Sequence, residues 1–253
     1  MATAYWHGEF HLIKGTLFAG TQENYLSSLS CYKEAHYSNP NYSMLRSRAS
    51  FYSYANEIIF GNGNKSDDPA LSFFDNSRTH LFQLDPAKVV AFDGSIVHLE
   101  DQSQFTVSAK GYCTFTDNDV IAIINNSKLS ISTDQIRIPD AFTFSLGGFK
   151  NENGDGNVDA SIAFVGRAEA NNPFNFMRNS YPEGIFNFVT IDNKGKPITN
   201  KGTFVFSGQN MGNIFQKQAM IDKKLISIDG IAVTDESLIA DDWDNDSLYI
   251  HLK

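Results

Sequence analysis

AFTFSLGGFKNENGDGNVDASIAFVG, residues 141–166, places two apolar segments on either side of a polar loop. Phe142, Phe144 and Leu146 alternate with small or polar residues in the first segment, and Ile162 and Phe164 repeat the alternation in the second. A period of two residues is typical of a strand with one buried face. The loop, residues 150–159, is rich in Asn, Asp and Gly, which favour a chain reversal. The stretch therefore predicts a hairpin of two antiparallel strands.

Short apolar runs also follow one another upstream of this hairpin. They are Leu81–Leu84, Val89–Phe92, Ile96–Leu99, Phe105–Val107, Tyr112–Phe115, Val120–Ile124 and Leu129–Ile131. Turn-forming pairs separate them, and one of these, Asp93-Gly94, predicts a two-residue hairpin turn. Short strands at close, regular spacing indicate an antiparallel meander. We therefore expect a mainly β protein, an antiparallel β-sandwich or barrel.

One N-terminal amphipathic helix is predicted over Gln22–His36. Thr21 can cap it, and Tyr25, Leu29 and Tyr32 fall on one face. A second, short helix is predicted within Gln209–Met220, and the strands resume at 225–233 and 248–252. No repeat and no low-complexity linker marks a boundary, so we expect a single β-rich domain over residues 1–253.

Charge and cysteine content narrow the range of possible binding partners and cellular compartments. The net charge is −9, from 29 acidic and 20 basic residues, which disfavours nucleic acid and anionic membranes as partners. Cys31 and Cys113 have neither disulfide-scaffold nor metal-ligand spacing and are expected to be free thiols. The N-terminal residues lack the pattern of a signal peptide, and no run is long enough for a membrane span. We expect a cytoplasmic, intracellular protein.

The polar loop contains a candidate calcium site. Asn151, Asn153, Asp155 and Asp159 place oxygen ligands at positions 1, 3, 5 and 9 of a calcium loop, with Gly156 at position 6. The twelfth position, where calcium loops carry a bidentate Glu, is Ile162, so a hairpin loop satisfied by its own hydrogen bonds is the favoured interpretation. We therefore expect no cofactor, with calcium at this loop as the minority alternative.

Two further groups of residues could bind a metal ion. Residues 241–246 form the densest acidic cluster, for which a solvated turn is the favoured interpretation. His7, Glu9 and His11 would project from one face of a strand predicted over Tyr5–Ile13, a spacing that suits zinc. A polar strand face is favoured there, because no second His or Cys pair accompanies it.

The remaining features of the sequence favour a structural role over an enzymatic one. No nucleophile elbow, phosphate-binding loop or dinucleotide motif is present, and most of the 21 Phe residues are expected in the core. We therefore expect a non-enzymatic structural protein that associates with itself into a homo-oligomer or larger assembly. Because Tyr and Lys titrate near about pH 10, alkali should loosen that assembly. The alternative is a β-sandwich that binds carbohydrate or another small ligand, with or without calcium. A metal enzyme built on His7, Glu9 and His11 is a third hypothesis.

Overall fold

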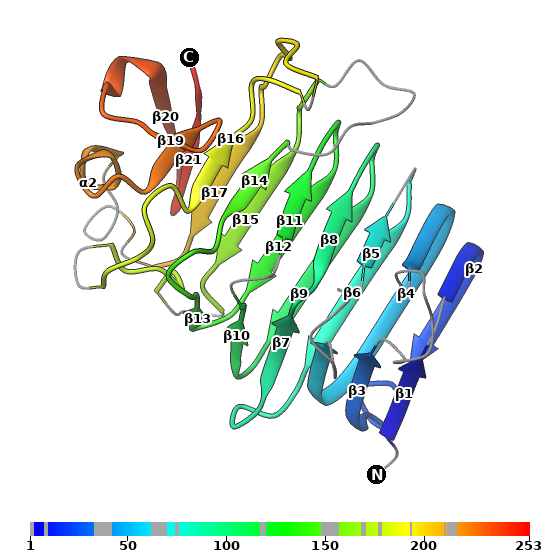
Figure 1. The fold of residues 1–253 in the computed structure, drawn as a ribbon. Helices are drawn as coiled ribbons and strands as arrows, with labels where there is room; N and C mark the ends of the chain where they lie inside the picture. Colours follow the sequence, from blue (N-terminus) through cyan, green and yellow to red (C-terminus); the bar gives the residue numbers. More distant parts are fainter. Residues whose placement is uncertain are drawn as a thin grey trace.

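The computed structural model describes most of the chain. The described residues are 3–7, 10–32, 42–61, 70–73, 76–116, 120–147, 157–167, 171–176, 179–192, 194–209, 211 and 217–253. For residues 3–7, 10–15, 30–32, 42–49, 70–73, 96 and 120 only the backbone is described. The strands lie side by side in rows that run from the N-terminal to the C-terminal end, so the two termini lie at opposite ends of the molecule (Figure 1).

The rows are three stacks of parallel strands, and the chain visits each stack in turn. The first stack contains β5 (Ala70–Phe73), β8 (Ile96–Leu99), β11 (Val120–Ile123), β14 (Phe144–Leu146), β16 (Phe186–Phe188) and β18 (Ile226–Ile228). The second contains β6 (Arg78–Gln83), β9 (Gln104–Ala109), β12 (Lys128–Ser132), β15 (Ser161–Val165) and β17 (Thr203–Ser207). The third contains β1 (Thr3–His7), β3 (Leu26–Tyr32), β7 (Val89–Asp93), β10 (Tyr112–Thr114) and β13 (Ile136–Arg137).

Each strand pairs with the strand three places along the chain through the middle of the molecule. Thus β9 pairs with β6 and β12, with Phe105 beside Thr79 and Leu129. This is the pairing of a parallel β-solenoid, in which successive turns of the chain stack on one another. Two longer strands join the stacks at the N-terminal end. β4 (Tyr42–Gly61) pairs in turn with β5, β6 and β7, and β2 (Phe10–Ala19) lies along β4.

Antiparallel strands close the C-terminal end. β21 (Ser247–Leu252) pairs with β17 and with β20 (Ile239–Asp244), and β19 (Ile231–Ala232) pairs with β18. The short helices α2 (Lys217–Asp222) and η1 (Glu236–Leu238) belong to the same end. In the described part of the chain, no helix has the length and apolar character that a membrane span needs.

The core lies between the stacks and is dominated by phenylalanine, as predicted. Inward-facing positions repeat from turn to turn, so Phe164 and Phe206 stack directly, with ring centroids 5.5 Å apart. Phe144, Phe174 and Phe186 meet Phe164 edge to face, an arrangement that the ring quadrupoles favour. All five side chains are completely buried.

The predicted antiparallel sandwich or barrel is wrong, although the protein is mainly β. The strand positions between residues 80 and 136 agree closely with β6 to β12. The partners differ, because alternation shows which face of a strand is buried and says nothing about the strand beside it. The hairpin at 141–166 is likewise wrong: β14 pairs with β11 and β16, whereas β15 pairs with β12 and β17. Asp93-Gly94 is a corner between β7 and β8, which do not pair with each other.

The predicted N-terminal helix is also wrong. Residues 22–25 form an exposed loop, and Leu26–Tyr32 is strand β3, bonded to β1 on one side and β4 on the other. Hydrogen bonds to two neighbouring strands override a weak local preference for helix. The predicted short helix within Gln209–Met220 overlaps α2, and the predicted last strand is β21.

Candidate functional site

Among the described residues, the N-terminal end of the solenoid is an open sheet edge. Within the described part of the chain, β1 pairs with β3 alone and β2 with β4 alone. Leu17 of β2 lies beside the buried Phe51 and therefore points toward the core side, yet it is 38% exposed because no described turn covers it. Phe18, on the outer side, is 58% exposed. The edge thus presents strand backbone together with two apolar side chains.

A ladder of aromatic rings leads from this edge along the outside of the second stack. It consists of Phe18, Tyr52, Tyr54, His80 and Phe82, and we call it the aromatic ladder. Phe18 stacks on Tyr52 at 5.2 Å, Tyr52 on His80 at 5.2 Å, and Tyr54 on Phe82 at 4.6 Å. Each ring covers the face of the next because the parallel register aligns them. Burial, assisted by the charge of Arg78, lowers the pKa of His80.

The aromatic ladder stops on both sides for identifiable reasons. Toward the C-terminus, the positions next to His80 and Phe82 are Thr106 and Ser108 of β9, which have no rings. Toward the N-terminus, Phe18 is the last described ring, and only one of its faces is covered by the ladder. Phe18 is therefore the place where a further ring could extend the ladder.

The opposite end of the molecule is built differently. Its outermost strand, β20, carries Asp241, Asp242 and Asp244 and is bonded to β21 in an antiparallel hairpin. Charged side chains on an edge strand oppose pairing with another chain. β2 carries Lys14 as its only Asp, Glu, Lys or Arg residue, and its segment Gly15–Ala19 has no charge. The two ends consequently differ in their capacity to add a strand.

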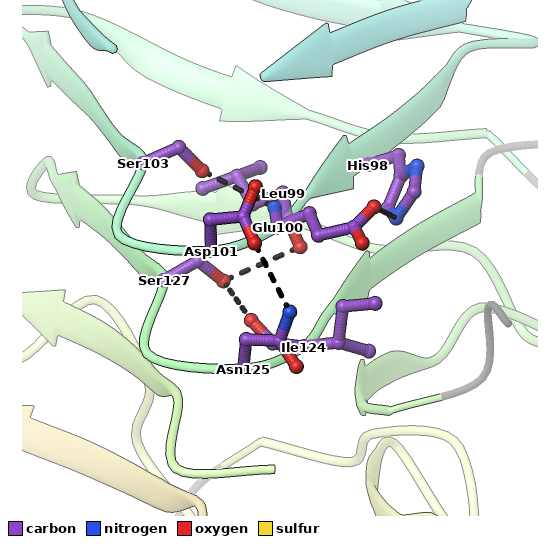
Figure 2. A network of polar contacts seen from close by, with 8 residues as sticks. All are labelled: His98, Leu99, Glu100, Asp101, Ser103, Ile124, Asn125 and Ser127. Carbon is purple, nitrogen blue, oxygen red and sulfur yellow. Dashed lines mark hydrogen bonds and ion pairs between the residues drawn. The ribbon is translucent and has the colours of Figure 1, made fainter. Parts of the chain in front are cut away.

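A polar network holds two corners of the solenoid together (Figure 2). Asp101 and Asn125 occupy corresponding corners of successive turns, with positive φ angles of 59° and 53°, and the Asn125 amide approaches Asp101 Oδ1 at 3.4 Å. The hydroxyl of Ser127 donates to the carbonyl oxygens of Leu99 and Ile124, at 3.3 and 2.7 Å. One side chain therefore links one turn to the turn before it.

His98 and Glu100 lie beside this network and are largely buried. Burial lowers the pKa of His98 to about 4, although the charge of Asp101 acts in the opposite direction. The ring is therefore neutral at neutral pH, and the 3.6 Å contact between its Nε2 and Glu100 Oε2 is then a polar contact and no salt bridge. We assign the cluster a structural role, because its hydrogen bonds fix backbone corners.

The candidate calcium loop lies mostly outside the described residues. This holds for Asn151, Asn153 and Asp155, whereas Asp159 is exposed and its amide donates to the carbonyl oxygen of Asn125 at 2.7 Å. Val158 is buried and bridges Asn125 and Asn200 in the neighbouring turns. The backbone of Val158 and Asp159 thus ends the loop by pairing with the neighbouring turns. The calcium site itself stays a prediction.

The acidic cluster at 241–246 forms part of the β20–β21 hairpin. Asp241 pairs with Lys217 at 2.8 Å, Asp242 with His251 at 2.9 Å, and Asp244 accepts from the amide of Asn245 at 2.8 Å. Among the residues that the structure describes, no three His, Cys, Asp or Glu side chains are grouped as metal ligands. The carboxylates have separate partners, and Asp241, Asp242 and Asp244 lie on strand β20, so the predicted turn is limited to residues 245–246.

The predicted strand that would carry His7, Glu9 and His11 is divided in two. His7 ends β1, which pairs with β3, and His11 belongs to β2, which pairs with β4. Glu9 and the side chains of both histidines lie outside the described residues. The two histidines thus lie on described strands with different partners, and the zinc site itself stays a prediction.

Sequence reasoning missed Phe18, Leu17 and the aromatic ladder. The local signal for the ladder is the alternation in two segments, which places Tyr52 and Tyr54 on one face of one strand, and His80 and Phe82 on one face of another. The stacking depends on the parallel register between β2, β4 and β6.

Comparison with known proteins gave no matching family model, no matching curated protein and no matching solved structure.

Proposed function

We propose that this protein is a non-enzymatic structural protein that associates with a second copy of itself through the open N-terminal edge. The observation that carries the proposal is the exposed strand β2, with Phe18 58% and Leu17 38% accessible beside an edge that no described strand covers. Unpaired strand edges are templates for pairing with another chain. Burial of the two apolar side chains would add to the favourable free energy of association.

The second copy is favoured as the partner by the charge and symmetry of the edge. The uncharged segment Gly15–Ala19 can lie antiparallel to its own copy without repulsion between like charges. The acidic hairpin at the far end disfavours addition there. We therefore expect a closed, head-to-head dimer in which the acidic ends point away from each other, and no open filament.

The test is the molar mass of the full chain by light scattering at neutral pH. Wild type should give twice the mass of one chain, and Phe18→Glu should give a single-chain mass, because it places two carboxylates at the symmetric contact. Trp243→Glu is the matched control: Trp243 is also an exposed aromatic residue, 45% accessible, but lies on β20 at the closed end. This variant should keep the wild-type mass.

Two outcomes would contradict the proposal. One is a wild-type chain that remains monomeric at high concentration. The other is a mass that Trp243→Glu reduces and Phe18→Glu leaves unchanged, since the interface would then lie at the C-terminal end. A repeat of the measurement at about pH 10.5, above the titration of Tyr and Lys, tests the expected loosening by alkali.

We further propose a reducing, cytoplasmic environment. Cys113 is a free thiol in the core, completely buried, and burial raises its pKa to about 12. A buried neutral thiol is a poor nucleophile and needs no partner.

A further inference from the structure

We propose that a niche on the outer side of the second stack binds a flat, uncharged heteroaromatic ring, such as that of a purine nucleoside. This role is separate from self-association. The niche has a volume of about 490 Å³ and lies where β4 and β6 meet the loop that joins β2 to β3. That size falls within the range of small-ligand sites, about 300–1,000 Å³. We call it the Tyr54 niche; its lining includes Gln22, Tyr25, Tyr54, Asn56, Phe82 and Lys110.

A glycine interrupts the aromatic ladder at this niche. In the ladder, Phe18 of β2 covers the face of Tyr52 that points to the N-terminal end. Tyr54 lies two residues further along β4, and Phe82 is the one ring that contacts it among the described residues. The residue two places after Phe18 is Gly20, and a Cβ added there would lie 2.7 Å from the carbonyl oxygen of Tyr54. A ring at position 20 is therefore excluded, and the N-terminal face of Tyr54 lines the niche.

The strand register makes room beside that face. The pairing of β2 with β4 ends one residue before Tyr54, and the pairing of β3 with β4 begins one residue after it. Residues 20–25 therefore lie opposite Tyr54 alone and leave the stack as a loop. Thr21 and Asn24 hold this loop together, because the amide of Thr21 donates to the carbonyl oxygen of Asn24 at 3.1 Å and the amide of Asn24 donates to Thr21 Oγ1 at 3.0 Å. The loop is a preformed wall, which lowers the ordering cost of binding.

The strand residues of the niche share the outer side of the sheet. Tyr54 and Phe82 are register partners, and their rings stack on each other. Ala55 is completely buried, so its neighbours Tyr54 and Asn56 point to the outer side. Tyr25, in the loop, is 37% exposed and lines the same niche. The aromatic rings and the amide group therefore face one space.

This lining suits both the face and the rim of a flat heteroaromatic ring. Phe82 lies on Tyr54 at 4.6 Å with an angle of 12° between the rings, and a bound ring can stack on the opposite face in the same way. Gln22 and Asn56 contribute amide groups, which both donate and accept hydrogen bonds and can recognise the edge of a purine. The charged group in the described lining, Lys110, follows β9 and is separated from β4 by β6. The open face of Tyr54 therefore favours an uncharged ring.

The test is isothermal titration calorimetry of the full chain with adenosine and with guanosine as the probes. Wild type should bind at least one of them. Tyr54→Leu should weaken that binding by about fivefold or more, the usual effect of removing one stack between a base and an aromatic side chain. Tyr249→Leu is the matched control, because Tyr249 is also a half-buried tyrosine of a strand but lies on β21 at the opposite end. This variant should keep the wild-type affinity.

Gln22→Ala is a second variant, which changes only the exposed loop and should also weaken binding; it decides alone if circular dichroism shows that Tyr54→Leu does not fold. The proposal is overturned if neither nucleoside binds or if either variant, once shown to be folded, binds as tightly as wild type. It is also overturned if methyl glucoside, a ring without an aromatic plane, binds as tightly as the nucleosides. Phe18 lies outside the described lining of the niche, so the monomeric Phe18→Glu variant should bind as wild type does. Failure of this site and failure of self-association therefore give different results.

Discussion

At the scale of single residues, His98 is the buried group with the clearest consequence for stability. Its pKa in the folded protein is about 4, below the ordinary value of 6.5. The unfolded chain therefore takes up a proton between those two pH values while the folded chain does not. Protonation of His98 therefore leaves the free energy of unfolding unchanged above about pH 6.5 and reduces it progressively as the pH falls toward about 4.

We predict that His98→Gln reduces the acid sensitivity of folding. Between pH 7 and 5 the histidine should cost the wild type about 2 kcal/mol of its free energy of unfolding, at about 1.4 kcal/mol for each pH unit below 6.5. Urea unfolding at both pH values measures this loss, which should be smaller in the variant. Ser130→Ala, on the outer side of β12, is the control and should show the wild-type loss; an equal loss in His98→Gln would contradict the assignment.

At the scale of the elements, the corner between the second and third stacks shows how turns are locked together. Gln83 donates from Nε2 to the carbonyl oxygen of Asn56 at 2.6 Å and accepts from the amide of Gly111 at 2.8 Å. The hydroxyl of Thr133 then donates to the carbonyl oxygen of Gly111 at 3.0 Å. Each corner is thus bonded to the corner above or below it.

We predict that Gly111→Ala destabilises the protein far more than Gly195→Ala. A Cβ at Gly111 would lie 1.8 Å from the carbonyl oxygen of Lys88, so two turns of backbone would have to separate. We expect Gly111→Ala to reduce the free energy of unfolding by about 3 kcal/mol, the upper end of the cost of overpacking. Gly195 has open space around it and a positive φ of 74°, so Gly195→Ala should reduce the free energy of unfolding by only about 1 kcal/mol, from backbone strain. Thermal unfolding of both variants measures the two losses of stability. Equal losses would contradict the close stacking of the corners.

The same elements show how far sequence reasoning reaches. Alternation located β6 to β12 and the phenylalanine core, because burial on one face leaves a period of two in the sequence. It could not supply the partners, since Asp-Gly or Lys-Gly can turn a corner of a solenoid as readily as it closes a hairpin. Phe18 escaped notice for a related reason: its exposure depends on β2 being the last described strand at the N-terminal end, and no local pattern encodes that.

At the scale of the whole molecule, the proposed self-association depends on one property, the parallel stacking of three strands per turn. Stacking creates two ends, and the ends are chemically unlike: β2 contains the uncharged segment Gly15–Ala19 with exposed Phe18, whereas β20 carries three aspartates in an antiparallel hairpin. An antiparallel sandwich of the same strands would have neither end. The pairing of the strands is therefore the claim to test first.

Amide–amide nuclear Overhauser effects in the deuterated protein measure that pairing directly. The stacking predicts contacts from β9 to β6 and β12, for example near Thr106 and Ser130, which lie side by side. Contacts from β9 to its sequence neighbours β8 and β10 instead would show a meander of hairpins and would contradict the solenoid.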